Sequence, residues 1–387
     1  MNILPNVLAH QGHMIDLRRQ IHQNPELGWQ EYDTQALILR ELGELNIPCE
    51  RVCGTGVVAV LRGALPGPVT GLRADMDALP IQEKSDVPYR SQKDGIMHAC
   101  GHDCHVAILL TVARVLKENQ GRLCGTIKLL FQPAEEIIEG AHALSMIPQI
   151  ADLDRIAAVH VWNDLDVNTF SAEIGPRLAC ADNIDLTIHG KSAHGAQPQN
   201  SVDAILAACA VVEQLQIVAS RKVSPLEPVV VTIGTIQGGT MSNIIANEVR
   251  LSGTVRCFSP QLRAQLPAML EQIAVSTAQA HGATCDFTYH SCTPPVLNEE
   301  SSTRIAQEAI TKLFGAEALV HLEKTMGGED FAWYLERIPG CLVFVGARNK
   351  KTGKFWPHHH ECFDVDEQAL VNGAALLAQF ALDAGKE

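Results

Sequence analysis

The sequence predicts an α/β protein of two domains, in which a larger domain is interrupted by a smaller, inserted one. Three observations support this. Strand-like and helical runs alternate over residues 56–161, as expected of a sheet covered by helices on both faces. After Asp182 the order becomes βαββαβ, that of a ferredoxin-like module. Beyond Pro294-Pro295 a helix, a strand and a last helix follow. We therefore assign residues 1–182 and 294–387 to the larger domain and residues 183–293 to the inserted domain.

The elements of the larger domain follow one another along its first part. Residues 7–45 have helical spacing that is broken at Asn24-Pro25. Short apolar runs then predict four strands, and the longer periodic runs between them predict two helices. The strands are expected at residues 56–61, 70–72, 126–131 and 156–161, and the helices at residues 102–117 and 141–146.

The inserted domain and the end of the chain are predicted in the same way. Its strands are expected at residues 184–188, 229–235, 248–257 and 284–289, with helices at residues 201–219 and 260–281. The chain then returns to the larger domain with a helix at residues 301–314, a strand at 340–345 and a helix at 367–384.

Composition limits the class of partner and the location. The 387 residues, 46% of them hydrophobic, suffice for two ordinary domains. A net charge of -14 without any basic block argues against nucleic acid or an anionic membrane as partner and favours a small molecule. No run reaches the roughly 18 uncharged apolar residues of a membrane span, and Pro5, His10 and His13 interrupt any signal peptide. We expect a cytoplasmic protein whose twelve cysteines are mostly reduced thiols.

Cysteine and histidine alternate where the helix at residues 102–117 begins. Cys100 and His102 are two residues apart, so a thiolate and an imidazole are directed toward one point and can hold a borderline divalent ion. A pair without metal is the alternative. The chain has no second Cys/His pair at zinc-finger spacing, so further ligands must come from distant segments. His160, in an apolar strand, is a ligand candidate or a hydrogen-bonded core residue.

Two adjacent carboxylates follow the strand at residues 126–131. Glu135 and Glu136 come directly after apolar residues and a proline, although such pairs are also common on solvated surfaces. At a strand end, one carboxylate can bind metal while the other takes a proton from water and returns it to a leaving nitrogen. This arrangement predicts cleavage of an amide bond.

Five motifs carry a family resemblance over residues 10–380. They read Arg73-Ala-Asp-Met-Asp-Ala-Leu-Pro80, His98-Ala-Cys-Gly-His-Asp-Cys-His105, Gln132-Pro-Ala-Glu-Glu136, Gly190-Lys-Ser-Ala-His194 and Gly327-Gly-Glu-Asp-Phe331. With these motifs the sequence resembles the dinuclear-metal amidohydrolase branch of the aminoacylase and carboxypeptidase superfamily, which includes hippurate hydrolases, N-acyl amino acid amidohydrolases and auxin-conjugate hydrolases.

The resemblance implies a role for each residue of the metal site. Cys100 would bridge two metals, with His102, Glu136 and His160 as further ligands and Glu135 as general base. Independently of the resemblance, Asp75 and Asp77 follow the strand at residues 70–72, where we expect them to hydrogen-bond to the imidazole ligands; for Asp77, opening a turn before Pro80 is the alternative.

The last ligand falls in a run of three histidines. The family motif His-x-Pro-x-Phe places the ligand at His359 and the aromatic residue at Phe363. Glu361 stands where proline is usual, so the register is open by one residue and His360 is the alternative. Without the motif, the triplet would read as a solvated loop.

Two residues of the inserted domain are predicted to belong to the site only because of the resemblance. Taken alone, His194 would be an ordinary loop histidine, and Asn243 in a glycine-rich turn needs no function. The resemblance implies that His194 donates to the oxyanion of the tetrahedral intermediate, often from the partner subunit, and that Asn243 lines the substrate site.

The activity implied is hydrolysis of an N-acyl or N-aroyl amino acid by water activated on two divalent metal ions. Zinc or manganese is expected, and cobalt or nickel would also suit the ligands. The inserted domain would serve as a lid and dimerisation module, which predicts a homodimer or a tetramer. Two rival interpretations are a dipeptidase or aminopeptidase, and a non-catalytic metal-binding or ligand-binding protein that keeps the fold.

Overall fold

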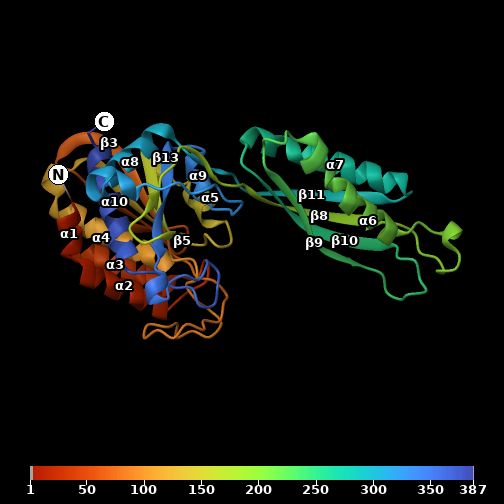
Figure 1. The fold of residues 1–387 in the computed structure, drawn as a ribbon, viewed down its shortest axis with the longest axis horizontal. Helices are drawn as coiled ribbons and strands as arrows, with labels where there is room; N and C mark the ends of the chain where they lie inside the picture. Colours follow the sequence, from red (N-terminus) through yellow and green to blue (C-terminus); the bar gives the residue numbers. More distant parts are fainter. Residues whose placement is uncertain (1–2, 387) are drawn as a thin grey trace. The chain divides into compact units, whose positions relative to one another are not determined.

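The structure, a computed structural model, describes residues 3–386, which form two compact units (Figure 1). The first unit comprises the chain up to Gly175, Leu297–Glu323 and the chain from Asp330 onward, and the second comprises Pro176–Val296 and Lys324–Glu329. The sequence analysis put the division at 182/183 and 293/294 and left Lys324–Glu329 in the larger domain. A mixed sheet with helices in the first unit confirms the predicted α/β class.

The first unit is built on a seven-stranded sheet. Its strand order is β1-β2-β4-β3-β5-β13-β6. Strands β4, β3, β5 and β13 run parallel, whereas β1, β2 and β6 join antiparallel at the two sides. The strand bounds are β1 Cys49–Val52, β2 Gly56–Arg62, β3 Leu65–Asp75, β4 Cys124–Gln132, β5 Arg155–Asp166, β6 Phe170–Ser171 and β13 Gly340–Arg348.

Helices α4 (His102–Glu118) and α10 (Gln368–Ala384) pack against each other and against the sheet. Both are buried along nearly their whole length, because neighbouring helices cover the sides that the sheet does not. The other helices are α1 Leu4–Leu8, α2 Gln11–Gln23, α3 Tyr32–Glu44, α5 Gly140–Leu144, α8 Glu300–Phe314 and α9 Ala332–Leu335. The predicted break at Asn24-Pro25 is confirmed, since α2 ends at Gln23.

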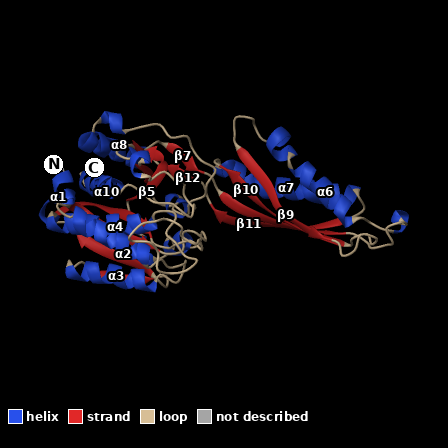
Figure 2. Ribbon diagram, turned by 60° about the horizontal axis from the view of Figure 1, so that its bottom comes forward, coloured by secondary structure: helices blue, strands red, loops and turns tan. Residues whose placement is uncertain are grey.

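The second unit is a four-stranded antiparallel sheet with two helices packed on it. Its strand order is β11-β8-β10-β9. Figure 2 shows α6 and α7 running side by side along this sheet. The elements follow the predicted βαββαβ order: β8 Ala181–His189, α6 Ala204–Leu215, β9 Val229–Gly238, β10 Glu248–Cys257, α7 Pro260–Ala280 and β11 Thr284–Thr293. Strands β7 (Gly175–Leu178) and β12 (Val296–Asn298) stand where the chain passes between the units.

One helical stretch differs from the prediction. Residues 201–219 were expected to form one helix, but α6 ends at Leu215 and a π-type turn follows at Val218–Lys222. By length and composition alone, Ala204–Lys222 is also the one stretch of residues 3–386 that could cross a membrane. It is interrupted by Glu213, and a third of it is buried within the protein.

Candidate metal centre

The predicted ligands of the first unit meet at one edge of its sheet. Strands β3 and β4 are parallel and end side by side, with Asp75 opposite Gln132, and β5 brings His160 alongside. Helix α4 starts nearby at His102. Because the carboxyl ends of parallel strands share one edge, residues far apart in the sequence come together there.

Three overlapping groups of side chains form a cluster. They are Cys100 with His102 and His160, Cys100 with Glu136 and His359, and His102 with Glu135 and Glu136. Within each group the ligand atoms lie within 4.8 Å of one another. The structure thus brings together the six residues that the sequence analysis singled out in this domain.

Individual distances define the cluster further. Cys100 Sγ lies 3.6 Å from His160 Nε2, and His359 Nε2 lies 3.5 Å from Glu136 Oε2. His102 Nε2 is 3.8 Å from Glu135 Oε2 and 3.9 Å from Glu136 Oε1.

Two buried atoms of the cluster test whether it fits a metal. His102 Nε2 and Glu136 Oε1 have no hydrogen-bond partner among residues 3–386. Leaving such atoms unpaired in the interior is costly, and a divalent cation between them would satisfy both. Thiolate, imidazole and carboxylate together suit zinc and its neighbours in the first transition row. The residues present therefore fit the implied metals.

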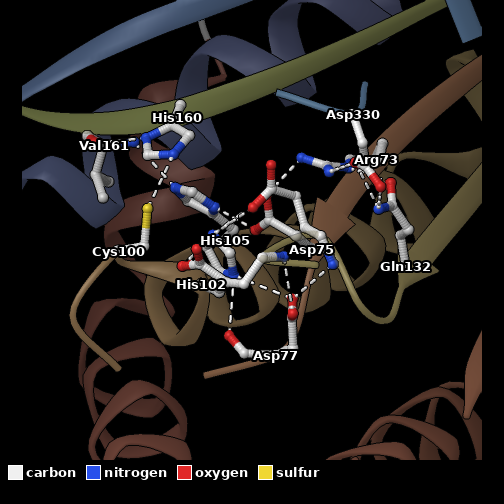
Figure 3. A network of polar contacts seen from close by, with 12 residues as sticks. Arg73, Asp75, Asp77, Cys100, His102, His105, Gln132, His160, Val161 and Asp330 are labelled. Carbon is white, nitrogen blue, oxygen red and sulfur yellow. Dashed lines mark hydrogen bonds and ion pairs between the residues drawn. The ribbon is translucent and has the colours of Figure 1, made fainter. Parts of the chain in front are cut away.

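Asp77 orients both halves of this cluster (Figure 3). Its carboxylate accepts hydrogen bonds from the backbone N–H groups of Glu135 and Glu136, each at 3.0 Å. Its backbone carbonyl lies 2.9 Å from His102 Nδ1, which donates to it. His102 therefore keeps a proton on Nδ1, which leaves Nε2, the nitrogen that faces the glutamates, as the one that would bind a metal. The prediction expected Asp77 to orient an imidazole; its backbone carbonyl accepts from His102 Nδ1, and its carboxylate Oδ1 lies 3.4 Å from the same nitrogen.

Asp75 acts on a histidine that the sequence analysis did not single out. It accepts from His105 Nδ1 at 2.5 Å and from Arg73, while His102 Nε2 stays 3.7 Å away (Figure 3). His105 Nε2 in turn accepts from the backbone N–H of Val161 at 3.0 Å. Both ring nitrogens of His105 are thus engaged, so it has no lone pair for a metal. Its spacing of three residues from His102, which puts both on one helix face, was the only sequence signal.

Electrostatics in the cluster favour a bound cation. Burial would lower the pKa of His102, but Asp75 and Cys100 hold it well above its ordinary value. Burial raises the pKa of the Cys100 thiol, and it raises the pKa of Glu136 to about 7. The cluster therefore holds protons that a divalent cation would displace.

The three histidines of residues 358–360 point to different partners. His359 has a left-handed backbone, with φ of 63°, and faces Glu136. His360 stacks on Trp356 with ring centroids 4.2 Å apart. His358 donates from Nε2 to the carbonyl of Val161 at 2.9 Å. Of the three, His359 is the one that joins a candidate ligand group.

The predicted residues of the inserted domain lie close to each other in the second unit. His194 and Ile244 form an isolated β-bridge, and the N–H of Gly195 donates to the carbonyl of Asn243 at 2.8 Å. His194 Nδ1 accepts from the N–H of Ala196 at 3.1 Å. Their roles in substrate binding stay predictions.

Comparisons with known proteins agree on one family. The sequence model of peptidase family M20/M25/M40 matches residues 71–383. The chain is 38% identical to N-acetylcysteine deacetylase of Bacillus subtilis over 371 residues, which cover 95% of this chain and 96% of that protein. It is 38% identical to IAA-amino acid hydrolase ILR1-like 4 of Arabidopsis thaliana over 373 residues, which cover 95% of this chain and 84% of that protein. The crystal structure of the Bacillus subtilis YXEP protein, described as a dinuclear metal binding peptidase, superposes with a TM-score of 0.87 at 35% identity and covers 98% of this chain and 99% of that one.

Proposed function

Since the chain belongs to peptidase family M20/M25/M40, we propose that it is a metal-dependent amidohydrolase that cleaves N-acyl or N-aroyl amino acids into a free acid and an amino acid. The observation that carries this proposal is the cluster in which two adjacent glutamates meet a thiolate and three imidazoles, all of them buried or half-buried except the exposed His359. Similarity to a deacetylase and to an IAA-amino acid hydrolase along nearly the whole chain supports the acylated substrate.

The residues of the cluster divide into ligands and a base. Cys100, His102, Glu136, His160 and His359 would hold two divalent ions, zinc or manganese first among them. Bound there, the ions would supply Lewis-acid activation of water and of the amide carbonyl. Glu135 takes the proton of the attacking water and passes it to the departing nitrogen. The hydrogen bond from its N–H to Asp77 holds the residue beside the ligands for this task.

The second unit would complete the site as a lid. His194 would donate to the developing oxyanion, and Asn243 would contact the substrate. We propose that residues 183–293 also form a homodimer, from which a tetramer could be built, so that His194 acts on the partner's cluster. Exposed apolar residues in this unit support an interface: Ile205 and Leu206 on α6 and Ile236 on the edge strand β9. We also propose that the protein is cytoplasmic.

Hydrolysis of a small substrate panel tests the function. The metal-stripped protein is assayed on N-acetyl, N-benzoyl and indole-acyl amino acids beside unblocked dipeptides, before and after zinc or manganese is added. Metal-restored release of an amino acid from an acylated substrate is expected. Preference for a free dipeptide amine would indicate the peptidase alternative instead.

A glutamate variant separates catalysis from binding. Glu135→Gln keeps the size of the side chain and removes the base, so turnover should fall by about 100- to 10,000-fold while the metals stay bound. If the wild-type protein holds two metals and turns over no member of the panel, the binding-protein alternative is favoured.

A further inference from the structure

Three imidazoles converge on the backbone of one residue, Val161, next to the metal centre. Its N–H donates to His105 Nε2 at 3.0 Å. Its carbonyl oxygen accepts from His160 Nδ1 at 2.7 Å and from His358 Nε2 at 2.9 Å. Val161 is fully buried, so water cannot take over these bonds.

The convergence fixes which nitrogen of each ring carries the proton. A carbonyl oxygen only accepts, so His160 is protonated on Nδ1 and His358 on Nε2. His105 accepts at Nε2 and is therefore protonated on Nδ1, from which it donates to Asp75. The Nε2 lone pair of His160 stays available and lies 3.6 Å from Cys100 Sγ (Figure 3).

His358 is held by its neighbours and lies outside the candidate ligand groups of residues 3–386. Its ring packs against Trp162, with centroids 4.6 Å apart, and against Phe363 at 5.0 Å. Its Nε2 is used by Val161, and it belongs to no candidate ligand group among residues 3–386. Yet it is next in the chain to His359, so it links the loop of that ligand to the strand of His160.

We propose that His358 and His105 are positioning residues, which clamp the two backbone groups of Val161 and thereby aim His160 Nε2 at the metal beside Cys100. The proposal rests on the proposed function only in taking His160 as a metal ligand. His105, backed by Asp75 and Arg73, fixes the N–H, and His358 shares the carbonyl with His160.

Metal binding by variants of His358 tests the clamp. His358→Phe and His358→Leu keep an apolar side chain between Trp162 and Phe363 but remove the donor, whereas His358→Gln keeps an N–H donor. Exposed His142 provides the matched control, His142→Leu. The readouts are zinc affinity by competition with a chelating dye, the visible spectrum of the cobalt-substituted protein, and the urea midpoint of the metal-free protein.

We expect the two variants without a donor to bind one metal about 10- to 100-fold more weakly, with an altered thiolate-to-cobalt band, because loss of an outer hydrogen bond misaims the ligand. His358→Gln should recover most of the affinity, and the urea midpoints of all three should agree. His105→Leu should change the same cobalt band.

Two other results would count against the clamp. Wild-type affinity and spectrum in both His358→Phe and His358→Leu would overturn it and leave the proposed function standing. A wild-type protein that binds no divalent cation would overturn the proposed function and the clamp together.

Discussion

Asp77 contacts both the glutamate pair and His102, the first through its carboxylate and the second through its backbone carbonyl. Its two carboxylate oxygens each accept one backbone N–H, from Glu135 and from Glu136, and both glutamates depend on this for their placement. Since a carboxamide has only one oxygen, it can accept only one of these bonds and turns an N–H₂ group toward the other.

We therefore expect Asp77→Asn to lower kcat/KM by about 10- to 100-fold. The urea midpoint should fall less than in Asp77→Ala. Steady-state kinetics on an N-acyl amino acid measure the effect, and Asp86→Asn at an exposed position is the control. Equal activity of Asp77→Asn and Asp86→Asn would contradict the role of Asp77.

Gly101 lies between two predicted ligands, Cys100 and His102, at a position whose backbone favours glycine. Its φ is 95°, and a Cβ atom there would lie 2.3 Å from Cγ2 of Val161. Gly101→Ala should lower the unfolding free energy by about 1–3 kcal/mol and weaken metal binding, because Cys100 and His102 shift with the backbone.

Gly12→Ala is the matched control for this substitution. Gly12 is the second residue of α2 and has nothing within 4 Å of its Cβ position, so alanine should be tolerated and should stabilise the protein by at most about 0.5–1 kcal/mol. Urea unfolding of both variants gives the comparison. A neutral Gly101→Ala would mean that the turn before α4 can relax.

The sequence predicted which residues form this centre better than it predicted the hydrogen bonds between them. Motif spacing pointed to Cys100 and His102 and to the glutamate pair, because the members of each pair are close in the sequence. It could not tell that Asp75 bonds to His105 rather than to a ligand, since that pairing joins β3 to α4 across the fold. It chose His359 as the last ligand but kept His360 as the alternative, because the register depends on the backbone turn at residue 359.

At the scale of single elements, the start of α6 is set by a local feature of the sequence, its N-cap residue Asp203. The side chain of Asp203 accepts from the N–H groups of Ile205 and Leu206. Asp203→Ala should lower the stability of the second unit by about 0.5–2 kcal/mol, whereas Asp203→Ser keeps an acceptor and most of the stability. Urea unfolding followed by circular dichroism checks this, and equal losses in both variants would rule out the cap as the cause.

The end of α6 was less predictable than its start. Apolar periodicity continues to residue 219, yet the helix stops at Leu215 and the chain turns through Val218–Lys222. A cap is set by one side chain and its nearest backbone groups, whereas an end without a glycine or proline depends on packing from the rest of the unit.

An ion cluster ties α2 to α4 and links the stability of the first unit to pH. His22 donates to Asp103 at 2.8 Å and lies 3.3 Å from Glu83. Burial lowers the pKa of His22, but Asp103 and Glu83 outweigh it, so the pKa lies above its ordinary value. The stability gained this way is complete below about pH 6.5 and is lost as pH rises through the folded-state pKa.

His22→Gln should therefore be most destabilising at low pH. The difference in unfolding free energy between wild type and variant should shrink as pH rises above about 6.5, because the wild type loses the charged histidine that the variant lacks throughout. Urea titrations of the metal-free proteins at a series of pH values measure it. A difference that grows with pH would have the wrong sign for this cluster.

For the whole molecule, metal binding should stabilise one unit selectively. All the predicted ligands lie in the first unit, and the two units have separate apolar cores. Zinc at about 100 times its dissociation constant should add about 2.7 kcal/mol to the stability of the state that binds it. Amide hydrogen exchange should slow in α4 and β5 and stay unchanged in α7. Uniform slowing over both units would indicate that they unfold together.

The fold class and the order of elements were predictable because each strand and helix carries its own periodicity. The position of β13 in the sheet was not predictable. It lies between β5 and β6, although the second unit and helices α8 and α9 separate it from both strands in the sequence. That order also bears on how the protein is made. While the ribosome is still synthesising the inserted segment, one edge of β5 has no strand to pair with, and β6 has no neighbouring strand, because β13 is the partner of both. The nascent chain is therefore open to aggregation or chaperone binding until β13 emerges, whereas the second unit's own sheet can already close.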